Sequence, residues 1–421
     1  MRPLSTGTEQ THRRVVITGI GLITPYAVGR EASWQNLLSA QAAIQPLEAL
    51  SQQFNRPLVG GVIPDESLSS TSLSGNSPLQ REPSLTLALH AAEEAIADAN
   101  LDLDQLETTS AGCVIGSSKG GMASFAQLAA APEQAPPELW LQCFPGATSQ
   151  FIAGHYNLKA AALTPVSACA TGFASIMRGA ELIRDGICET VFAGSTDASL
   201  LPAVLGSFHR MGVLASRLDS PAEACRPYDI RRNGFVVGEG AGILILESLE
   251  RARKRGATPY AEWCSGNLGA DSTHLMQFDP QAKSLSRLIT HTLDRSSLSP
   301  ADIDYINLHG TGTQINDVYE THAIRSAFGK SADSVHCSSL KGGMGHLLGA
   351  AGSVELAFTL LAMRDGVVPP TLNLQEPDPE CDLNYTPLTA VTREIKSALK
   401  LSFGFGGHLA AGVVRKYEAG R

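Results

Sequence analysis

The chain has 421 residues, of which 43% are hydrophobic and 17% charged, enough for two or three domains or one large two-lobed domain with a sizeable core. Its formal net charge of −9 argues against nucleic-acid binding. No apolar run approaches the roughly 20 residues that span a bilayer. Because residues 1–14 are polar, with no apolar signal core, we expect no membrane association and a cytoplasmic location.

The first predicted elements alternate between strand and helix. Residues 15–20 form an apolar run typical of a buried strand, and residues 45–82 are rich in Ser, Pro, Gln and Gly, which predicts an irregular excursion. Helical spacing of apolar residues follows over 85–100, and a second strand is predicted over 111–116. This alternation favours an α/β fold with mainly parallel strands.

A repeat further along the chain predicts two related halves. The segment 169–172 opens a helical pattern that closes at Gly186, and the segment 349–352 opens another that closes at Gly366. Strand-like runs, 163–167 and 334–338, precede the two patterns. We therefore predict halves at 1–258 and 259–421, with their two helices meeting near a pseudo-twofold axis.

Cys169 is the cysteine whose surroundings suggest chemistry. None of the eight cysteines forms a CxxC pair, and most are expected to be small buried hydrophobes. Cys169 lies among small residues at a predicted strand-to-helix junction, where the helix N-terminus favours a nucleophilic thiolate. The alternative is an ordinary buried structural cysteine.

Two histidines lie in comparable glycine-bounded turns. His309 follows a predicted strand, and His346 directly precedes the second repeat helix, so the internal symmetry predicts that His346 approaches Cys169. A lone histidine usually has a structural role, and a Cys-His-His set could also bind zinc. The wide separation of the three residues, without a further ligand at suitable spacing, disfavours a metal site.

Taken together, these motifs carry a family resemblance. The segments 165–172, 307–313 and 340–352 occur in that order, with 140 residues from Cys169 to His309 and 37 from His309 to His346, and 226–229 and 233–242 add a further signature. The chain resembles the elongating β-ketoacyl-acyl carrier protein (ACP) synthases, and is similar to β-ketoacyl-ACP synthase II. The resemblance implies a thiolase-like five-layer αβαβα sandwich of two similar halves. It implies no cofactor, and a homodimer or a heterodimer with a ketosynthase-like paralogue.

The resemblance also implies a mechanism. Cys169 would accept an acyl group from acyl-ACP, and malonyl-ACP would lose carbon dioxide and attack the acyl-cysteine as an enolate stabilised by His309 and His346. Backbone N–H groups of Cys169 and Phe405 would hold the oxyanion, and the Phe405 side chain would act as a mobile gate.

Supporting roles are implied for several charged residues. Lys341 would fix the local charge, with Glu320 as a suggested partner, although Glu320 could equally be an exposed helix charge. Arg81, Arg210 and Arg217 are candidates for docking an acidic carrier protein, with a solvated face as the alternative.

Three departures from the family pattern suggest an unusual substrate. His408 and Leu409 follow the GFGG segment where the family usually has Thr-Asn, Lys119 stands near the expected acyl pocket, and Asn233 replaces a usual Asp. These changes make a specialised polyketide or polyene pathway a hypothesis beside fatty acid synthesis.

Three other functions are alternatives to the elongating synthase. The first is a non-condensing partner subunit of the chain-length-factor type, which usually lacks the active cysteine. The second is a thiolase or a starter-unit synthase that uses coenzyme A thioesters, and the paired histidines disfavour both. The third is a cysteine hydrolase, for which no orienting motif is present.

Overall fold

The computed structural model describes residues 13–64, 82–218 and 220–419 of the chain. Their main feature is a mixed sheet built from two five-stranded halves with the same topology. The N-terminal half has the order β6-β5-β7-β8-β1 (Ala161–Leu163, Ala111–Gly116, Thr190–Asp197, Gly240–Ser248 and Val15–Thr24). The C-terminal half has the order β11-β10-β14-β15-β9 (His336–Ser338, Tyr305–Asn307, Ser397–Gly404, His408–Lys416 and Ala261–Ala270). In each half the first three strands are parallel and the last two pairings antiparallel.

The two halves are related in register as well as in strand order. They join through β1 and β9, which pair antiparallel only between residues 15–17 and 261–263. A bulge interrupts β1 opposite β8 after Ile17, and the equivalent bulge interrupts β9 opposite β15 after Trp263. A shared irregularity at matching positions supports a genuine structural repeat.

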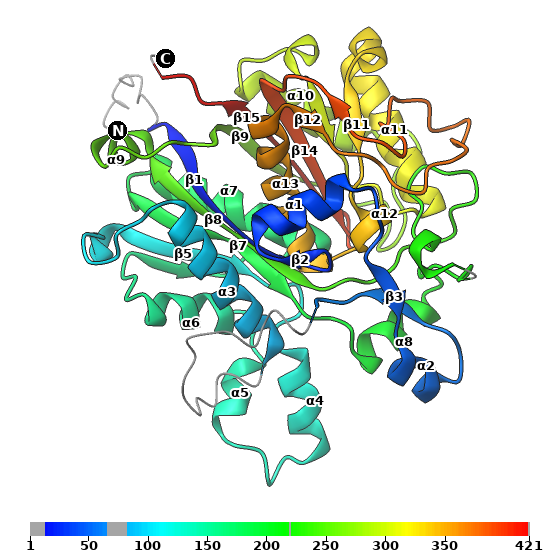
Figure 1. Ribbon diagram of the computed structural model, residues 1–421, viewed down its shortest axis with the longest axis horizontal. Helices are drawn as coiled ribbons and strands as arrows, with labels where there is room; N and C mark the ends of the chain where they lie inside the picture. Colours follow the sequence, from blue (N-terminus) through cyan, green and yellow to red (C-terminus); the bar gives the residue numbers. More distant parts are fainter. Residues whose placement is uncertain (1–12, 65–81, 219, 420–421) are drawn as a thin grey trace, which may run out of the picture.

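Helices form the other layers (Figure 1). Helices α7 (Thr171–Arg184) and α13 (Ala351–Asp365) lie between the two halves of the sheet and pack against strands of both. The outer faces are covered by α3 (Pro83–Asp98) and α6 (Ala147–His155) on one side, and by α10 (Lys283–Arg295) and α11 (Gln314–Phe328) on the other. The predicted five-layer αβαβα sandwich is confirmed.

The central helices cross at equivalent glycines. A Cβ on Gly172 would lie 2.8 Å from the backbone nitrogen of Ser353, and a Cβ on Gly352 would lie 2.5 Å from that of Phe173. Both contacts are closer than any side chain allows, so both crossing positions require glycine. The two repeat helices do meet near the pseudo-twofold axis, as the sequence pattern indicated.

Some local predictions were wrong. Residues 164–167 are not a strand, because the chain leaves the sheet after Leu163 to form the turn ahead of Cys169. The segment 45–64 is partly regular, since it forms β3 (Ile44–Pro46), α2 (Glu48–Phe54) and β4 (Val59–Gly61); the rest of the predicted excursion, 65–81, lies outside the described residues. The β3–β4 pairing is a small separate sheet that composition alone did not reveal.

The remaining elements are short or peripheral. They are β2 (Ala27–Val28), α1 (Arg30–Leu38), α4 (Met122–Ala130), α5 (Glu138–Gln142), α8 (Pro202–Arg210), α9 (Leu249–Lys254), α12 (Lys341–Met344), β12 (Val367–Val368) and β13 (Val391–Thr392). None of the helices in the described part of the chain combines the length and apolarity needed to cross a membrane.

Candidate active site

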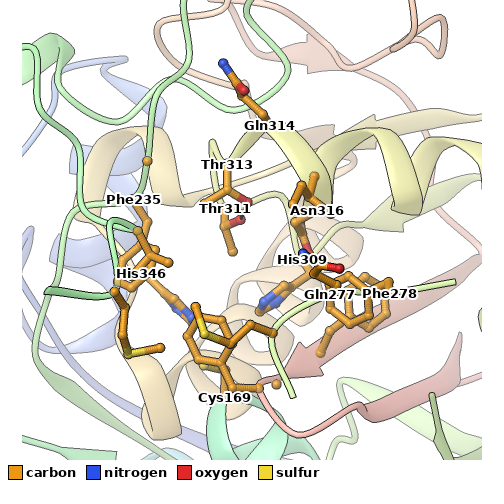
Figure 2. A pocket seen from close by; sticks show the side chains of 18 of the residues that line it. Cys169, Phe235, Gln277, Phe278, His309, Thr311, Thr313, Gln314, Asn316 and His346 are labelled. Atoms are coloured by element: carbon orange, nitrogen blue, oxygen red, sulfur yellow. Dashed lines mark hydrogen bonds between the residues drawn. The ribbon is translucent and has the colours of Figure 1, made fainter. Parts of the chain in front are cut away.

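One cavity of about 490 Å³ gathers the side chains that the sequence singled out. Cys169 from the N-terminal half and His309, His346 and Phe405 from the C-terminal half all line it. Figure 2 shows both imidazoles turned toward the space beside Cys169. His309 and His346 follow Cys169 by 140 and 177 residues in the sequence, yet all three share one site because the two halves are stacked.

Cys169 lies at a strained turn ahead of α7. It belongs to the 3₁₀ turn η4 (Ala168–Ala170), which begins with Ala168 at a φ of 47°. In the other half Leu348 has a φ of 48° one residue before Gly349. A non-glycine residue in this region is strained, and the strain recurs at matching positions. These two turns, 168–170 and 348–350, are the elbows of the two halves. The N-terminal elbow carries Cys169, and the C-terminal elbow carries Gly349 at the equivalent position.

The surroundings of Cys169 keep it protonated. Burial raises the pKa of the thiol to about 11, although the ammonium groups of Lys119 and Lys341 oppose this shift. The expected resting thiolate is therefore wrong, since desolvation outweighs the cations. A reaction in which Cys169 acts as a nucleophile would therefore have to remove this proton during the attack.

His309 and His346 are a pair of neutral imidazoles. Their ring centroids lie 5.3 Å apart with the rings nearly perpendicular, at 84°. Burial lowers the pKa of both rings well below the usual value, and Lys341 and Lys400 lower both further. His346 Nδ1 accepts a hydrogen bond from the Leu348 N–H at 3.3 Å. The proton of its neutral ring is thus on Nε2, which is available as a donor.

Two buried carboxylates hold the turn that presents His309. Glu320 accepts hydrogen bonds from the His309 N–H at 2.7 Å, from the Gly310 N–H at 2.9 Å and from the Tyr228 hydroxyl at 2.7 Å. Asp317 accepts from the Thr311 N–H at 3.1 Å in the same turn. Glu320 is fully buried, so it is not an exposed helix charge, and burial raises its pKa to about 7.

Lys341 binds a different carboxylate from the one suggested by the sequence. Its ammonium donates to the His309 carbonyl and to Glu355 Oε1, and no bond to Glu320 is present. The other oxygen of Glu355 accepts from Lys400 at 2.6 Å. The suggested Lys341–Glu320 pair is wrong because Glu320 is occupied by the backbone of the His309 turn.

The loop that carries Phe405 closes one side of the cavity. Gly404 packs so tightly that a Cβ there would lie 3.0 Å from the Cys169 nitrogen, which brings the start of this loop to the nucleophile. Phe405 is half-buried, and its ring centroid lies 6.4 Å from that of Phe208. Gly406 and Gly407 follow at φ values of 84° and 77°.

Backbone contacts anchor this loop. The Gly406 N–H donates to the Leu275 carbonyl at 2.9 Å, and the Asp271 N–H donates to the Gly407 carbonyl at 2.8 Å. His408 is exposed, whereas Leu409 is buried in the core. The His408-Leu409 pair therefore does not leave the loop without an anchor.

The other two departures from the family pattern lie close to the site. Lys119 donates to Asp197 at 3.1 Å, and Asp197 also accepts from the Gly349 N–H at the second elbow. Asn233 lines the cavity and accepts from the Ser216 N–H at 2.9 Å. Hydrogen bonds hold both side chains in place. Asn233 lines the cavity, and the Lys119 ammonium acts on the pKa of Cys169.

Arg210 and Arg217 are both exposed and lie close in sequence to residues that line the cavity. Arg210 ends α8 directly before Met211, which lines the cavity, and Arg217 shares a neighbouring pocket with Asn233. Arg81, the third predicted docking residue, lies outside the described residues.

Among the buried charged residues that sequence reasoning missed, four support the site or its neighbouring turns: Asp197, Asp317, Glu355 and Lys400. Two of them carried a detectable signal. Glu355 lies in the otherwise mostly apolar helix α13, and Lys400 lies in the apolar strand β14, where an isolated charge is costly without a partner. Among the described residues, no group of three or more His, Cys, Asp or Glu side chains is arranged to hold a metal ion.

Comparisons with known proteins agree with this geometry. Residues 12–252 match the family model "Beta-ketoacyl synthase, N-terminal domain", and residues 260–375 match "Beta-ketoacyl synthase, C-terminal domain". A 3-oxoacyl-[acyl-carrier-protein] synthase 2 of Synechocystis is 35% identical, covering 96% of this chain and 99% of its own. The tetracenomycin polyketide synthase ketoacyl synthase alpha subunit of Streptomyces glaucescens is 34% identical, covering 97% and 98%.

Solved ketosynthase structures are also similar to this chain along nearly its whole length. A type II polyketide ketosynthase described in complex with its acyl-carrier protein (AntDE:AntF) superposes with a TM-score of 0.89 at 31% identity, over 97% of this chain and all of that one. The ishigamide ketosynthase/chain length factor also gives a TM-score of 0.89, at 30% identity and with the same coverage.

Proposed function

The chain belongs to the β-ketoacyl synthase family and is a condensing acyltransferase; we propose that it elongates acyl chains on ACP, with Cys169 as nucleophile and His309 and His346 as donors to the enolate. The observation that carries the proposal is the convergence of these three side chains on one cavity. A relative named as a 3-oxoacyl-[acyl-carrier-protein] synthase and one named as a polyketide synthase subunit both match along nearly the whole chain. The proposal therefore specifies the reaction, and the length and type of the acyl chain are to be determined by experiment.

The first half-reaction uses the N-terminal elbow. The Cys169 sulfur attacks the carbonyl of acyl-ACP, its proton passes to the departing ACP thiolate, and the acyl group remains as a thioester on Cys169. The backbone N–H of Cys169, together with that of Phe405, holds the developing oxyanion. Because the pKa of Cys169 is raised, proton removal accompanies attack instead of preceding it.

The second half-reaction uses the C-terminal half. The bond from the malonyl α-carbon to its carboxylate breaks, carbon dioxide leaves, and the electron pair remains as the enolate of the ACP thioester. The neutral rings of His309 and His346 donate to the enolate oxygen. The α-carbon then attacks the acyl-cysteine, and the expelled Cys169 thiolate takes up a proton. Each neutral ring keeps one N–H, which it can donate to the enolate oxygen.

Intact-mass spectrometry tests the proposal directly. Enzyme mixed with a panel of acyl-ACPs should gain one acyl mass at Cys169, and addition of malonyl-ACP should remove it as a β-ketoacyl-ACP two carbons longer appears. The Cys169→Ala variant should do neither. Absence of both adduct and product across a broad panel would instead indicate a non-condensing partner subunit, which the intact Cys169, His309 and His346 set makes the less favoured candidate.

Arg210 and Arg217 are proposed as part of the surface that receives ACP. Both are exposed and flank residues that line the cavity or its neighbouring pocket. Cations around the mouth steer an acidic carrier toward the nucleophile and accelerate encounter more than they tighten binding. Charge reversal of both arginines should raise the KM for acyl-ACP and leave the rate with a small acyl thioester unchanged.

A dimer is proposed on the edge of the sheet at β6. This edge strand carries the exposed Leu163 and packs on α6, which contacts α5, where Trp140 is 53% and Leu141 62% exposed. An open edge and a patch of this kind are typical of an interface. Native mass spectrometry of the purified chain distinguishes a homodimer from a subunit that requires a ketosynthase-like paralogue.

A further inference from the structure

Directly behind the two catalytic histidines lies a fully buried chain of three charges. Glu355 on α13 accepts from Lys341 through one carboxylate oxygen and from Lys400 on β14 through the other, at 2.6 Å in the second case. Each ammonium also donates to a backbone carbonyl, Lys341 to that of His309 and Lys400 to that of Leu401 at 2.6 Å. With two ammonium groups and one carboxylate, the cluster has a net positive charge.

The equivalent positions in the other half show that the fold does not require these charges. Glu355 lies six residues after Gly349, and the residue six after Cys169 is Ser175, which bonds only to the Thr171 carbonyl of its own helix. Lys400 is the fourth residue of β14, and the fourth residue of β7 is Ala193. The N-terminal half therefore builds the same elbow, helix and strand without a charge at the positions equivalent to Glu355 and Lys400.

We propose that Lys400 is a positioning residue for the condensation step, whose ammonium, held by Glu355, sets the electrostatic potential at His309 and His346 as the malonyl group loses carbon dioxide. The proposal rests on the function proposed above and deepens it. Lys400 touches no reacting atom. A positive potential from behind the rings favours the negative charge that develops on the enolate and disfavours protonation of either imidazole.

The charged surroundings of Lys400 are consistent with this role. Burial lowers the pKa of Lys400 to about 8, with Lys341 acting in the same direction and Glu355 on α13 and Glu320 on α11 opposing it. Lys400 in turn lowers the pKa of both histidines. From β10, the buried Tyr305 faces Glu355, and burial raises its pKa, so it stays neutral. Above about pH 8 Lys400 loses its proton, and the cluster loses its net charge.

Single-turnover kinetics on Lys400→Met separate the two half-reactions. Enzyme is acylated with acyl-ACP, mixed with malonyl-ACP and quenched, so that acylation and condensation are timed separately. We expect acylation within about threefold of the parent and condensation slower by about tenfold or more. Lys396→Met, just before β14 with a side chain 65% exposed, is the matched control and should change neither step.

The pH profile and a second variant identify the cause as charge. The parent should lose condensation rate above about pH 8, and Lys400→Met should lack this alkaline limb. The double variant Lys400→Met/Glu355→Gln restores one net positive charge through Lys341 and should recover condensation at least about threefold over Lys400→Met.

Two results would overturn the proposal. One is a Lys400→Met enzyme whose condensation rate and pH profile match those of the parent. The other is a lower melting temperature with acylation and condensation slowed equally and no recovery in the double variant, which is the signature of a structural role. Failure of the parent itself to form the acyl adduct would instead count against the proposed function.

Discussion

The two elbows of this protein have the same backbone and opposite chemistry. In the N-terminal half, Cys169 lies in the turn just before α7, and the positions behind it carry Ser175 and Ala193. In the C-terminal half, α13 begins after Gly349, and the equivalent positions carry Glu355 and Lys400. The first elbow therefore holds a thiol without charged side chains at these two positions, whereas the second has a net positive cluster behind two neutral imidazoles. The difference indicates a division of labour, with acyl transfer on one side and enolate stabilisation on the other.

Removing the nucleophile has the largest expected effect. Cys169→Ala should lose acyl transfer and condensation together, by about four orders of magnitude or more, because no other thiol lines the cavity in the described structure. Rates with acyl-ACP and malonyl-ACP check this. Cys188→Ala, another buried cysteine away from the cavity, is the control and should retain both steps. Residual condensation in Cys169→Ala near the parent rate would contradict the division of labour.

The symmetry itself can be broken at the helix crossing. Gly172→Ala and Gly352→Ala each introduce a Cβ within 2.8 Å of a backbone nitrogen from the opposite helix, so each should reduce the free energy of unfolding by about 2–3 kcal/mol. Chemical denaturation measures both. The exposed-surface variant Gly154→Ala, where a Cβ meets nothing within 4 Å, is the control. A large effect in only one of the crossing variants would show that the halves do not contribute equally.

Much of this architecture could be predicted from the sequence. The glycine spacing and the strand-like runs before it marked both repeat helices and predicted that they meet, whereas the crossing at Gly172 and Gly352 is seen only in the structure. The motifs located Cys169, His309 and His346, because short glycine-bounded turns carry a local signal. The partner of Lys341 could not be predicted, since Glu355 is brought to it only by the packing of α12 against α13. The resting state of Cys169 was misjudged for a related reason: the helix N-terminus is visible in the sequence, but the depth of burial is not.

The carboxylate that supports the His309 turn gives a smaller expected effect. The Glu320 carboxylate accepts three hydrogen bonds. In Glu320→Gln an NH₂ group replaces one carboxylate oxygen and faces a donor, so a buried N–H or O–H loses its acceptor. We expect a loss of about 1–3 kcal/mol in the free energy of unfolding and condensation slowed more than acylation. Glu394→Gln, with a side chain 65% exposed, should be neutral. Equal slowing of both half-reactions would indicate that Glu320 supports the whole site, not the C-terminal half alone.

The smallest expected effect concerns the protonation state of the Cys169 thiol. Burial raises the pKa of its thiol to about 11, so the thiolate fraction should grow about tenfold per pH unit between pH 7 and pH 10. Alkylation by iodoacetamide, mapped to Cys169 by peptide mass spectrometry, should accelerate accordingly. A rate that is already constant at pH 7 would mean that the elbow does stabilise a thiolate.

The measurement that tests the division of labour most directly is single turnover on the double variant His309→Ala/His346→Ala. Acyl-ACP is added first and malonyl-ACP second, and the enzyme mass is followed by intact-mass spectrometry. The account predicts that the acyl adduct on Cys169 forms at close to the parent rate and then persists, with condensation slowed by at least about 10²–10³-fold. Failure to form the adduct, or its conversion to β-ketoacyl-ACP at the parent rate, would contradict it.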